Sequence, residues 1–111
     1  MRRGELWWAS LGLPYGSAPG YRRPVLIVSA NRFNDSTLKT VLVMPLTRSL
    51  LRADQPGNVR LPVKGTGLRE PSVVIGSQVN TVNKITLTER IGRVPDDLMG
   101  AVEEQLHLVL A

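Results

Sequence analysis

Short apolar runs are spread along most of the chain, and they predict buried β-strands. Residues 25–28 are Val-Leu-Ile-Val and follow Pro24, which cannot donate a sheet hydrogen bond and therefore suits the first position of a strand. Residues 40–46 and 72–79 contain similar runs, and the second becomes polar at its end. Residues 5–9 predict a first strand. Because adjacent positions in the run 25–28 are apolar, we expect both faces of that strand to be buried.

Weaker patterns fill the intervals between these runs. Residues 58–63 alternate apolar and polar side chains, which predicts a strand with one solvated face. Residues 84–88 and 90–94 predict two short strands or one bent strand. The Asn, Asp and Ser residues of 31–36 favour a turn or a single helical turn. Residues 50–57 are polar, carry charges of both signs, and predict a mobile link.

The pattern changes at Pro95, where a helical period begins. Leu98, Val102, Leu106 and Val109 are three or four residues apart, so they form one apolar face of a helix over about residues 95–110. The sum is a mainly β protein with a C-terminal helix, in which an antiparallel small barrel carries the helix. No repeat or domain boundary is visible, so residues 1–111 are expected to form a single domain.

Composition narrows the chemistry that the chain can perform. Cysteine is absent and histidine occurs once, so thiol chemistry is excluded and a histidine-based triad or metal site is disfavoured; we expect no metal and no cofactor. The net charge of +5 comes from 11 Arg against 3 Lys, which favours nucleic acid or an acidic protein as partner. We expect no signal peptide, because Arg2 and Arg3 lead into Glu5 and the paired tryptophans rather than into an apolar run. We expect no membrane association, because no apolar run approaches the roughly 20 residues that cross a bilayer.

Polar residues at the ends of the predicted strands, and in one loop, form a candidate site. Arg23 precedes the strand at 25–28, and Thr47 follows the strand at 40–46. The Gly-, Pro- and Ser-rich loop at 12–21 contains Gly16 and Ser17, whose backbone N–H groups could face an anion. Ser72 and Gln78 supply a further hydroxyl and an amide.

Arginine, hydroxyl and amide groups together suit phosphate binding, but they provide no nucleophile. RNA supplies its own nucleophile in the 2′-hydroxyl group, so this set suits transesterification of an RNA phosphodiester without metal. The alternative for Arg23 is a solvated residue that merely flanks a strand.

Several of these residues belong to segments that resemble a known family. The segments, in chain order, are Arg3-Gly4-Glu5-Leu6-Trp7-Trp8, Gly16-Ser17, Arg23-Pro24-Val25-Leu26-Ile27-Val28, Pro45-Leu46-Thr47, and Ser72-Val73-Val74 with Gln78 and Thr81. This pattern resembles the MazF/PemK/Kid toxins of bacterial type II toxin–antitoxin systems. The resemblance implies an SH3-like barrel and a homodimer in the bacterial cytoplasm. It also implies a sequence-specific, metal-independent endoribonuclease (an mRNA interferase) acting on single-stranded RNA, and a cognate antitoxin whose acidic tail covers the RNA groove.

The resemblance also implies roles for individual residues. Arg23 matches the family's essential arginine and Thr47 its threonine at a strand end, so both are expected to be catalytic. Ser17 matches the loop serine and Gln78 a glutamine near the substrate groove; Gly16, Ser72 and Asn80 complete the expected substrate-binding set. Two positions depart from the family pattern, since Ala18 replaces a common glutamate and Asn80 a frequent arginine.

Two other function classes stay open on the sequence. A CcdB-like toxin of the same fold would bind gyrase without cutting RNA, and an SH3-like module would only hold RNA or protein. Of Trp7 and Trp8, one is expected in the core and one at a surface or interface, since neighbours on a strand point to opposite sides. Surplus apolar residues, namely one of these tryptophans with Leu50, Leu51 and Leu110, would suit a symmetric dimer contact.

Overall fold

Seven strands and a long C-terminal helix make up most of the structure, a computed structural model that describes residues 1–10 and 22–111. The strands are β1 (Glu5–Ser10), β2 (Arg22–Ile27), β3 (Thr40–Thr47), β4 (Asn58–Leu61), β5 (Ser72–Ile75), β6 (Asn80–Asn83) and β7 (Leu87–Arg93). The helices are α1 (Asn31–Asn34), α2 (Asp96–Leu110) and the 3₁₀ turns η1 (Leu50–Asp54), η2 (Gly76–Gln78) and η3 (Lys84–Thr86). None of the helices in these ranges is long and apolar enough to span a membrane.

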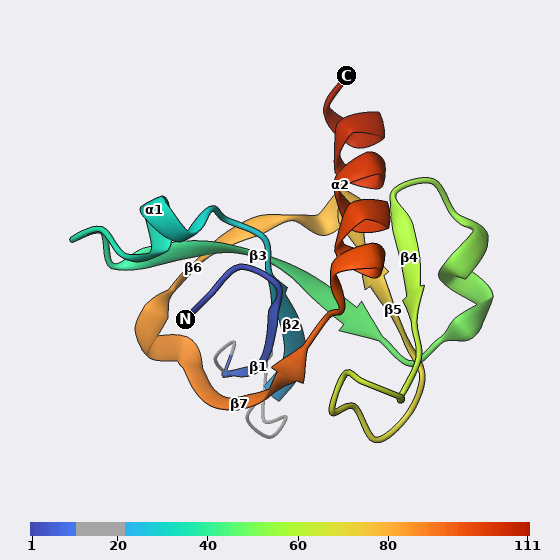
Figure 1. Ribbon diagram of the computed structural model, residues 1–111, viewed down its shortest axis with the longest axis horizontal. Coiled ribbons are helices and arrows are strands. Elements are labelled where there is room, and N and C mark those ends of the chain that lie inside the picture. The colour runs from blue at the N-terminus through green and yellow to red at the C-terminus, as the bar shows by residue number, and fades with distance from the viewer. Residues whose placement is uncertain (11–21) are drawn as a thin grey trace, which may run out of the picture.

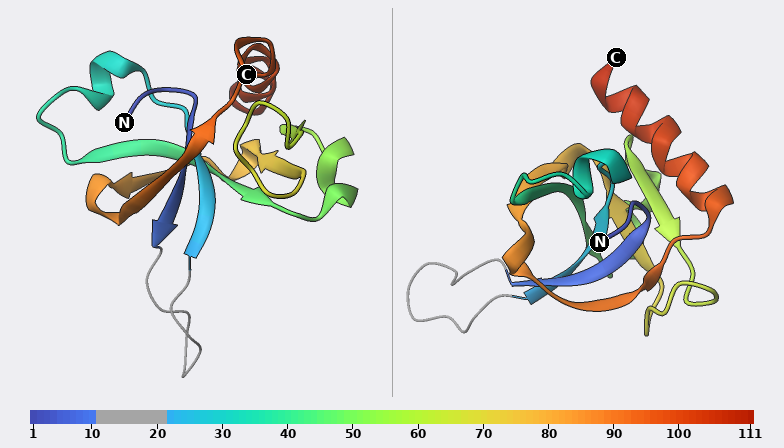
Figure 2. Two further views of the ribbon diagram at one scale, coloured as in Figure 1. Left: turned by 60° about the horizontal axis from the view of Figure 1, so that its bottom comes forward. Right: turned by 60° about the vertical axis from the view of Figure 1, so that its left-hand side comes forward.

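The strands form one curved antiparallel sheet in the order β4-β5-β3-β2-β1-β7, and β6 also pairs with β3. The strands wrap around an interior, and α2 lies beside β4 (Figures 1 and 2). In the described part of the chain β4 and β7 do not pair, so the sheet is not closed. The predicted mainly β class with a C-terminal helix is confirmed, with a strongly curved sheet in place of a fully closed barrel.

Strand β3 is the longest and is shared between the two halves of the sheet. Its first half pairs with β6 through residues 40–43, and its end pairs with β5 through Leu46 and Thr47. Pro45 lies between these two partners, where its missing N–H group costs the least. The strand therefore changes partner at the residue that cannot donate a hydrogen bond on that side.

The core has two parts, because successive side chains of a strand point to opposite faces of the sheet. One part contains Leu26 and Leu46 and is covered by Met99 and Val102 of α2. The other contains Val25, Ile27, Val41 and Val43, with Trp7 packed against it. Both faces of β2 are therefore buried, as its continuous apolar run predicts. Helix α2 begins at Asp96, close to the predicted start.

The structure adds to or differs from the predicted elements in three segments. The strand expected over 72–79 ends at Ile75, and η2 begins at Gly76. Gly76 packs closely on Gly57 at this point, since a Cβ at Gly76 would lie 2.1 Å from the Gly57 carbonyl oxygen. The segment at 84–88 is mostly η3 rather than a strand. The link at 50–57 contains η1.

Candidate functional site

A groove of about 910 Å³ opens at the ends of β2 and β3, between β1 and β7 on one side and residues 67–72 on the other. Its charged lining residues are five arginines and two glutamates, Arg22, Arg23, Arg48, Arg69, Arg90, Glu70 and Glu89. Its remaining lining is apolar or uncharged polar: Trp8, Pro24, Leu46, Thr47, Gly67, Leu68, Ser72 and Ile91. The lining carries three more positive than negative charges, which attracts an anionic ligand.

Arg23 and Thr47 are brought together at this groove. The register that pairs Val25 with Pro45 places Arg23 and Thr47 two residues further along the same strands, so their side chains share a face of the sheet. Arg23 Nη2 donates a hydrogen bond of 3.0 Å to the carbonyl oxygen of Leu46, the residue just before Thr47. The guanidinium group is half-buried and anchored beside the threonine.

The Thr47 hydroxyl has hydrogen-bonding capacity to spare. Its Oγ1 accepts a bond of 3.2 Å from the backbone N–H of Ser49, and the side chain is only partly buried. A hydroxyl group can donate one hydrogen bond in addition to those it accepts. Thr47 can therefore donate to a ligand oxygen while Arg23 supplies a fixed positive charge next to it.

Three other groove arginines, Arg22, Arg48 and Arg90, form ion pairs with glutamates, and Arg22 also lies against an aromatic ring. Arg22 pairs with Glu89 at 2.9 Å and Arg48 pairs with Glu70 at 2.8 Å. The Arg22 guanidinium carbon lies 4.8 Å from the centre of the Trp8 ring. Trp8 thus belongs to the groove wall, whereas Trp7 packs against the core, although both side chains are half-buried.

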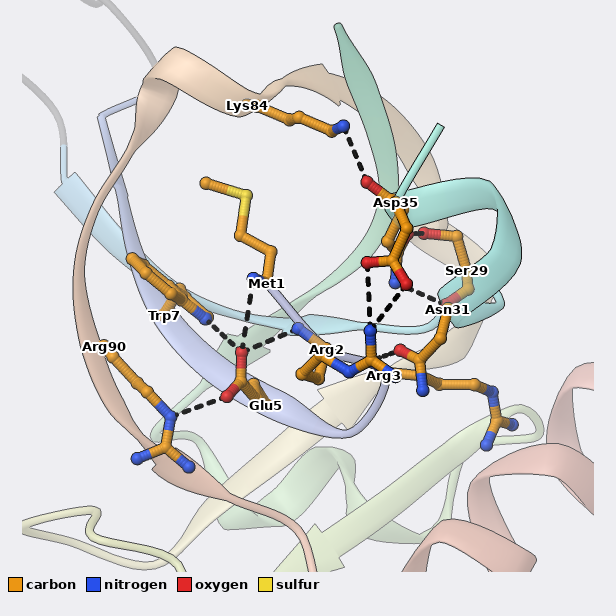
Figure 3. A network of polar contacts seen from close by, with 11 residues as sticks. Met1, Arg2, Arg3, Glu5, Trp7, Ser29, Asn31, Asp35, Lys84 and Arg90 are labelled. Atoms are coloured by element: carbon orange, nitrogen blue, oxygen red, sulfur yellow. Dashed lines mark hydrogen bonds and ion pairs between the residues drawn. The ribbon is translucent and has the colours of Figure 1, made fainter. Parts of the chain in front are cut away.

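Glu5 pairs with Arg90, another arginine of the groove lining (Figure 3). Its Oε2 pairs with Arg90 Nε at 2.8 Å, and its Oε1 accepts bonds from the Trp7 indole N–H at 3.1 Å and the Arg2 backbone N–H at 2.7 Å. Burial alone raises the pKa of Glu5, but these three donors outweigh it and hold the pKa below its ordinary value of 4.5. The carboxylate therefore stays ionised and keeps Arg90 in place.

The other predicted site residues have separate outcomes. Ser72 lines the groove, but it is buried and its hydroxyl donates to the Glu70 carbonyl oxygen at 3.1 Å. Gln78 in η2 and Asn80 in β6 are exposed and are not among the lining residues, and Asn80 Nδ2 donates to the Gln78 carbonyl oxygen at 3.3 Å. Gly16 and Ser17 lie outside the described residues, as does Ala18. Their assignment to substrate binding stays a prediction.

Sequence reasoning missed several groove residues that the fold supplies. Arg22, Glu89 and Arg90 come from β2 and β7, strands far apart in the chain that both pair with β1. Strand β7 carries the charged residues Glu89, Arg90 and Arg93, but the register that sets Glu89 opposite Trp8 was not visible in the sequence.

The fold and the groove together define a small curved β-sheet protein with a basic, partly apolar groove suited to a phosphate-bearing chain. The family model for the PemK-like, MazF-like toxins of type II toxin–antitoxin systems matches residues 2–110. The chain belongs to this family, and the predicted resemblance is confirmed.

Individual relatives and solved structures agree with this assignment. The chain is 44% identical to endoribonuclease MazF6 of Mycobacterium tuberculosis over 108 residues, which cover 97% of this chain and 95% of that one. It is 32% identical to endoribonuclease EndoA of Bacillus subtilis over 114 residues, covering 100% of this chain and 95% of that one. A mycobacterial endoribonuclease solved in complex with its cognate antitoxin matches with a TM-score of 0.79 and 26% identity, covering 99% of this chain and 94% of that one. The curated relatives of this toxin are thus endoribonucleases.

Proposed function

We propose that this toxin is a sequence-specific, metal-independent endoribonuclease that cuts single-stranded RNA in the groove at the ends of β2 and β3. The observation that carries the proposal is the placement of the Arg23 guanidinium, hydrogen-bonded to the Leu46 carbonyl oxygen and therefore beside Thr47. The excess of positive charge along the groove and the endoribonuclease activity of the relatives both support it.

The proposed reaction is internal transesterification. The 2′-oxygen of the nucleotide before the cut forms a bond to phosphorus, and the bond from phosphorus to the 5′-oxygen of the next nucleotide breaks. The 2′-hydroxyl loses its proton, and the leaving 5′-oxygen gains one. The products carry a 2′,3′-cyclic phosphate and a 5′-hydroxyl group.

Arg23 and Thr47 have complementary roles in this step. A guanidinium group with a pKa above about 12 is a poor base at neutral pH, so Arg23 acts by stabilising the charge that builds up on the phosphate oxygens. Thr47 donates a hydrogen bond to a phosphate oxygen or orients the 2′-hydroxyl group. Arg23 is already fixed by Leu46, so little side-chain freedom is lost when the substrate binds.

The partners follow from the same groove. Its basic lining would accept an acidic segment of a cognate antitoxin in place of RNA, as the antitoxin complex of the mycobacterial relative suggests. The toxin would act in the bacterial cytoplasm, where mRNA is found. The exposed side chains of Leu50, Leu51 and Leu110 suit burial between two copies of the chain, and solution mass would test this homodimer.

The decisive experiment is cleavage of a long RNA by the purified protein in EDTA, followed by mapping of the new ends. Wild type is expected to cut at a short recurring sequence, and a single 2′-deoxy substitution before the cut should stop cleavage there. Arg23→Ala should abolish cutting while the protein remains folded. Arg32→Ala is the matched control, because Arg32 is exposed on α1 outside the groove.

Two results would overturn the proposal. Cutting of the 2′-deoxy substrate would refute internal attack. A folded wild-type protein that leaves RNA intact would support the alternatives, a gyrase-binding toxin or a non-catalytic binding module.

A further inference from the structure

Arg22 combines an aromatic contact with an ion pair. Its guanidinium carbon lies 4.8 Å from the centre of the Trp8 ring, and its Nη2 pairs with Glu89 Oε2 at 2.9 Å. Within the described residues this is the one cation–π contact. The three residues come from β1, β2 and β7, and the sheet register fixes them, since Trp8 stands directly opposite both Pro24 and Glu89.

The Arg22 side chain is fixed on two sides and still 48% exposed. The guanidinium group lies over the Trp8 ring, and Glu89 pairs with one of its nitrogens. Both Arg22 and Trp8 line the groove, so a ligand there can reach the exposed part of the guanidinium group. The result is a flat surface held in position before any ligand arrives.

The neighbouring arginine on β2 has a different environment. Arg22 and Arg23 are consecutive at the start of β2, and both line the groove. Arg23 donates a hydrogen bond to a backbone carbonyl group, whereas the charge of Arg22 is balanced by Glu89. Arg22 is therefore less suited to binding a phosphate group, and its planar surface is the part that a ligand would contact.

We propose that Trp8 and Arg22 form a nucleobase-stacking subsite, in which a base beside the cut stacks on the exposed face of the Arg22 guanidinium. This inference rests on the proposed RNA-cleaving function and adds a residue that selects the substrate. Proteins that bind single-stranded RNA stack unpaired bases on aromatic rings and on arginine planes. The contacts with Trp8 and Glu89 would hold the Arg22 guanidinium in place for such stacking.

The test is a set of RNA oligonucleotides that span the mapped cleavage sequence, carry a 2′-deoxy sugar at the cut, and are abasic at one position at a time. Binding is measured, so the result does not depend on cleavage. With wild type, removal of the stacked base should weaken binding about 5- to 150-fold, the range measured for base–aromatic stacking. We call the ratio of the dissociation constants of the abasic and the intact RNA the abasic penalty. With Arg22→Lys, which keeps the positive charge and loses the planar group, this abasic penalty should fall close to 1.

Arg48→Lys is the matched control, because Arg48 is also an exposed groove arginine paired with a glutamate, but no aromatic ring of residues 1–10 or 22–111 makes a cation–π contact with it. It should keep the full abasic penalty. Trp8→Leu should reduce the abasic penalty as Arg22→Lys does. Circular dichroism should show that the Trp8→Leu protein is folded. Equal penalties in wild type and Arg22→Lys at every position would refute the subsite. The proposed function would survive that result if wild type cuts RNA and Arg23→Ala does not.

Discussion

Glu5 should contribute a large share of the stability of the sheet for a single side chain. Its carboxylate accepts bonds from the Arg2 backbone, the Trp7 indole and the Arg90 guanidinium, and its side chain is only 16% exposed. In Glu5→Gln the amide nitrogen must face at least one of these donors, so at least one charge-assisted bond, worth about 1.5–3 kcal/mol, is lost. We expect the free energy of unfolding to fall by about 2 kcal/mol, or roughly 8 °C in Tm for a chain of this size.

The effect should depend on pH in a defined direction. The pKa of Glu5 in the folded protein is below its ordinary value of 4.5. The stability that the carboxylate contributes is therefore fully present above pH 4.5 and is lost as the pH falls through the lower, folded-state pKa. The gap between wild type and Glu5→Gln should be widest at neutral pH and should close in acid.

Urea denaturation followed by circular dichroism, at one fixed protein concentration, measures this gap at about pH 7 and about pH 3. Glu89→Gln is the matched control, because Glu89 is 67% exposed and makes one ion pair, so its loss should cost only about 0.2–1 kcal/mol. The reasoning would be refuted if Glu5→Gln matched wild type at neutral pH, or if the gap persisted unchanged in acid.

Three further predictions use other parts of the molecule. Thr47→Val should slow RNA cleavage by about 100-fold in single-turnover assays, the usual effect of losing one hydrogen-bond donor to the transition state; an unchanged rate would remove Thr47 from the mechanism. Gly92→Ala should destabilise the fold by about 3 kcal/mol or prevent folding, because the new Cβ would lie 2.0 Å from the Thr66 carbonyl oxygen. Gly100→Ala, on α2 with open space around it, should instead stabilise by about 0.5–1 kcal/mol, and urea denaturation compares the two. Arg69→Gln should lower the salt dependence of RNA binding by about 0.7 in the log–log slope if this exposed groove residue contacts one phosphate, and an unchanged slope would contradict that contact.

Much of the fold could be predicted because its central strands contain continuous apolar runs. The apolar runs in β2 and β3 are buried on both faces, so the sequence marks them clearly. Strand β6 was missed because Asn-Thr-Val-Asn is polar and mostly exposed, and it is held by pairing with β3 rather than by burial. The end of β5 was misplaced because the close contact between Gly57 and Gly76 is a property of the folded chain.

The candidate site was predictable in part for a similar reason. Arg23 and Thr47 stand out because each adjoins a strong apolar strand, and antiparallel pairing of those two strands brings them together. Trp8, Arg22 and Glu89 could not be grouped from the sequence, because β1 and β7 pair with register irregularities that only the folded sheet reveals. The position of a residue along its own strand is therefore easier to predict from the sequence than the residues that lie next to it on a neighbouring strand.

The position of β3 in the sheet also determines which strands can separate before the whole protein unfolds. This strand bonds to β2, β5 and β6, so separating it requires both halves of the sheet to come apart, whereas β4 and β7 lie at the ends of the pairing order. The backbone amides of β3 should therefore exchange with deuterium only when the whole protein unfolds, while those of the outer strands exchange through smaller fluctuations. Thr47 is carried on the most persistent element of the fold, and its alignment with Arg23 should survive every motion short of denaturation.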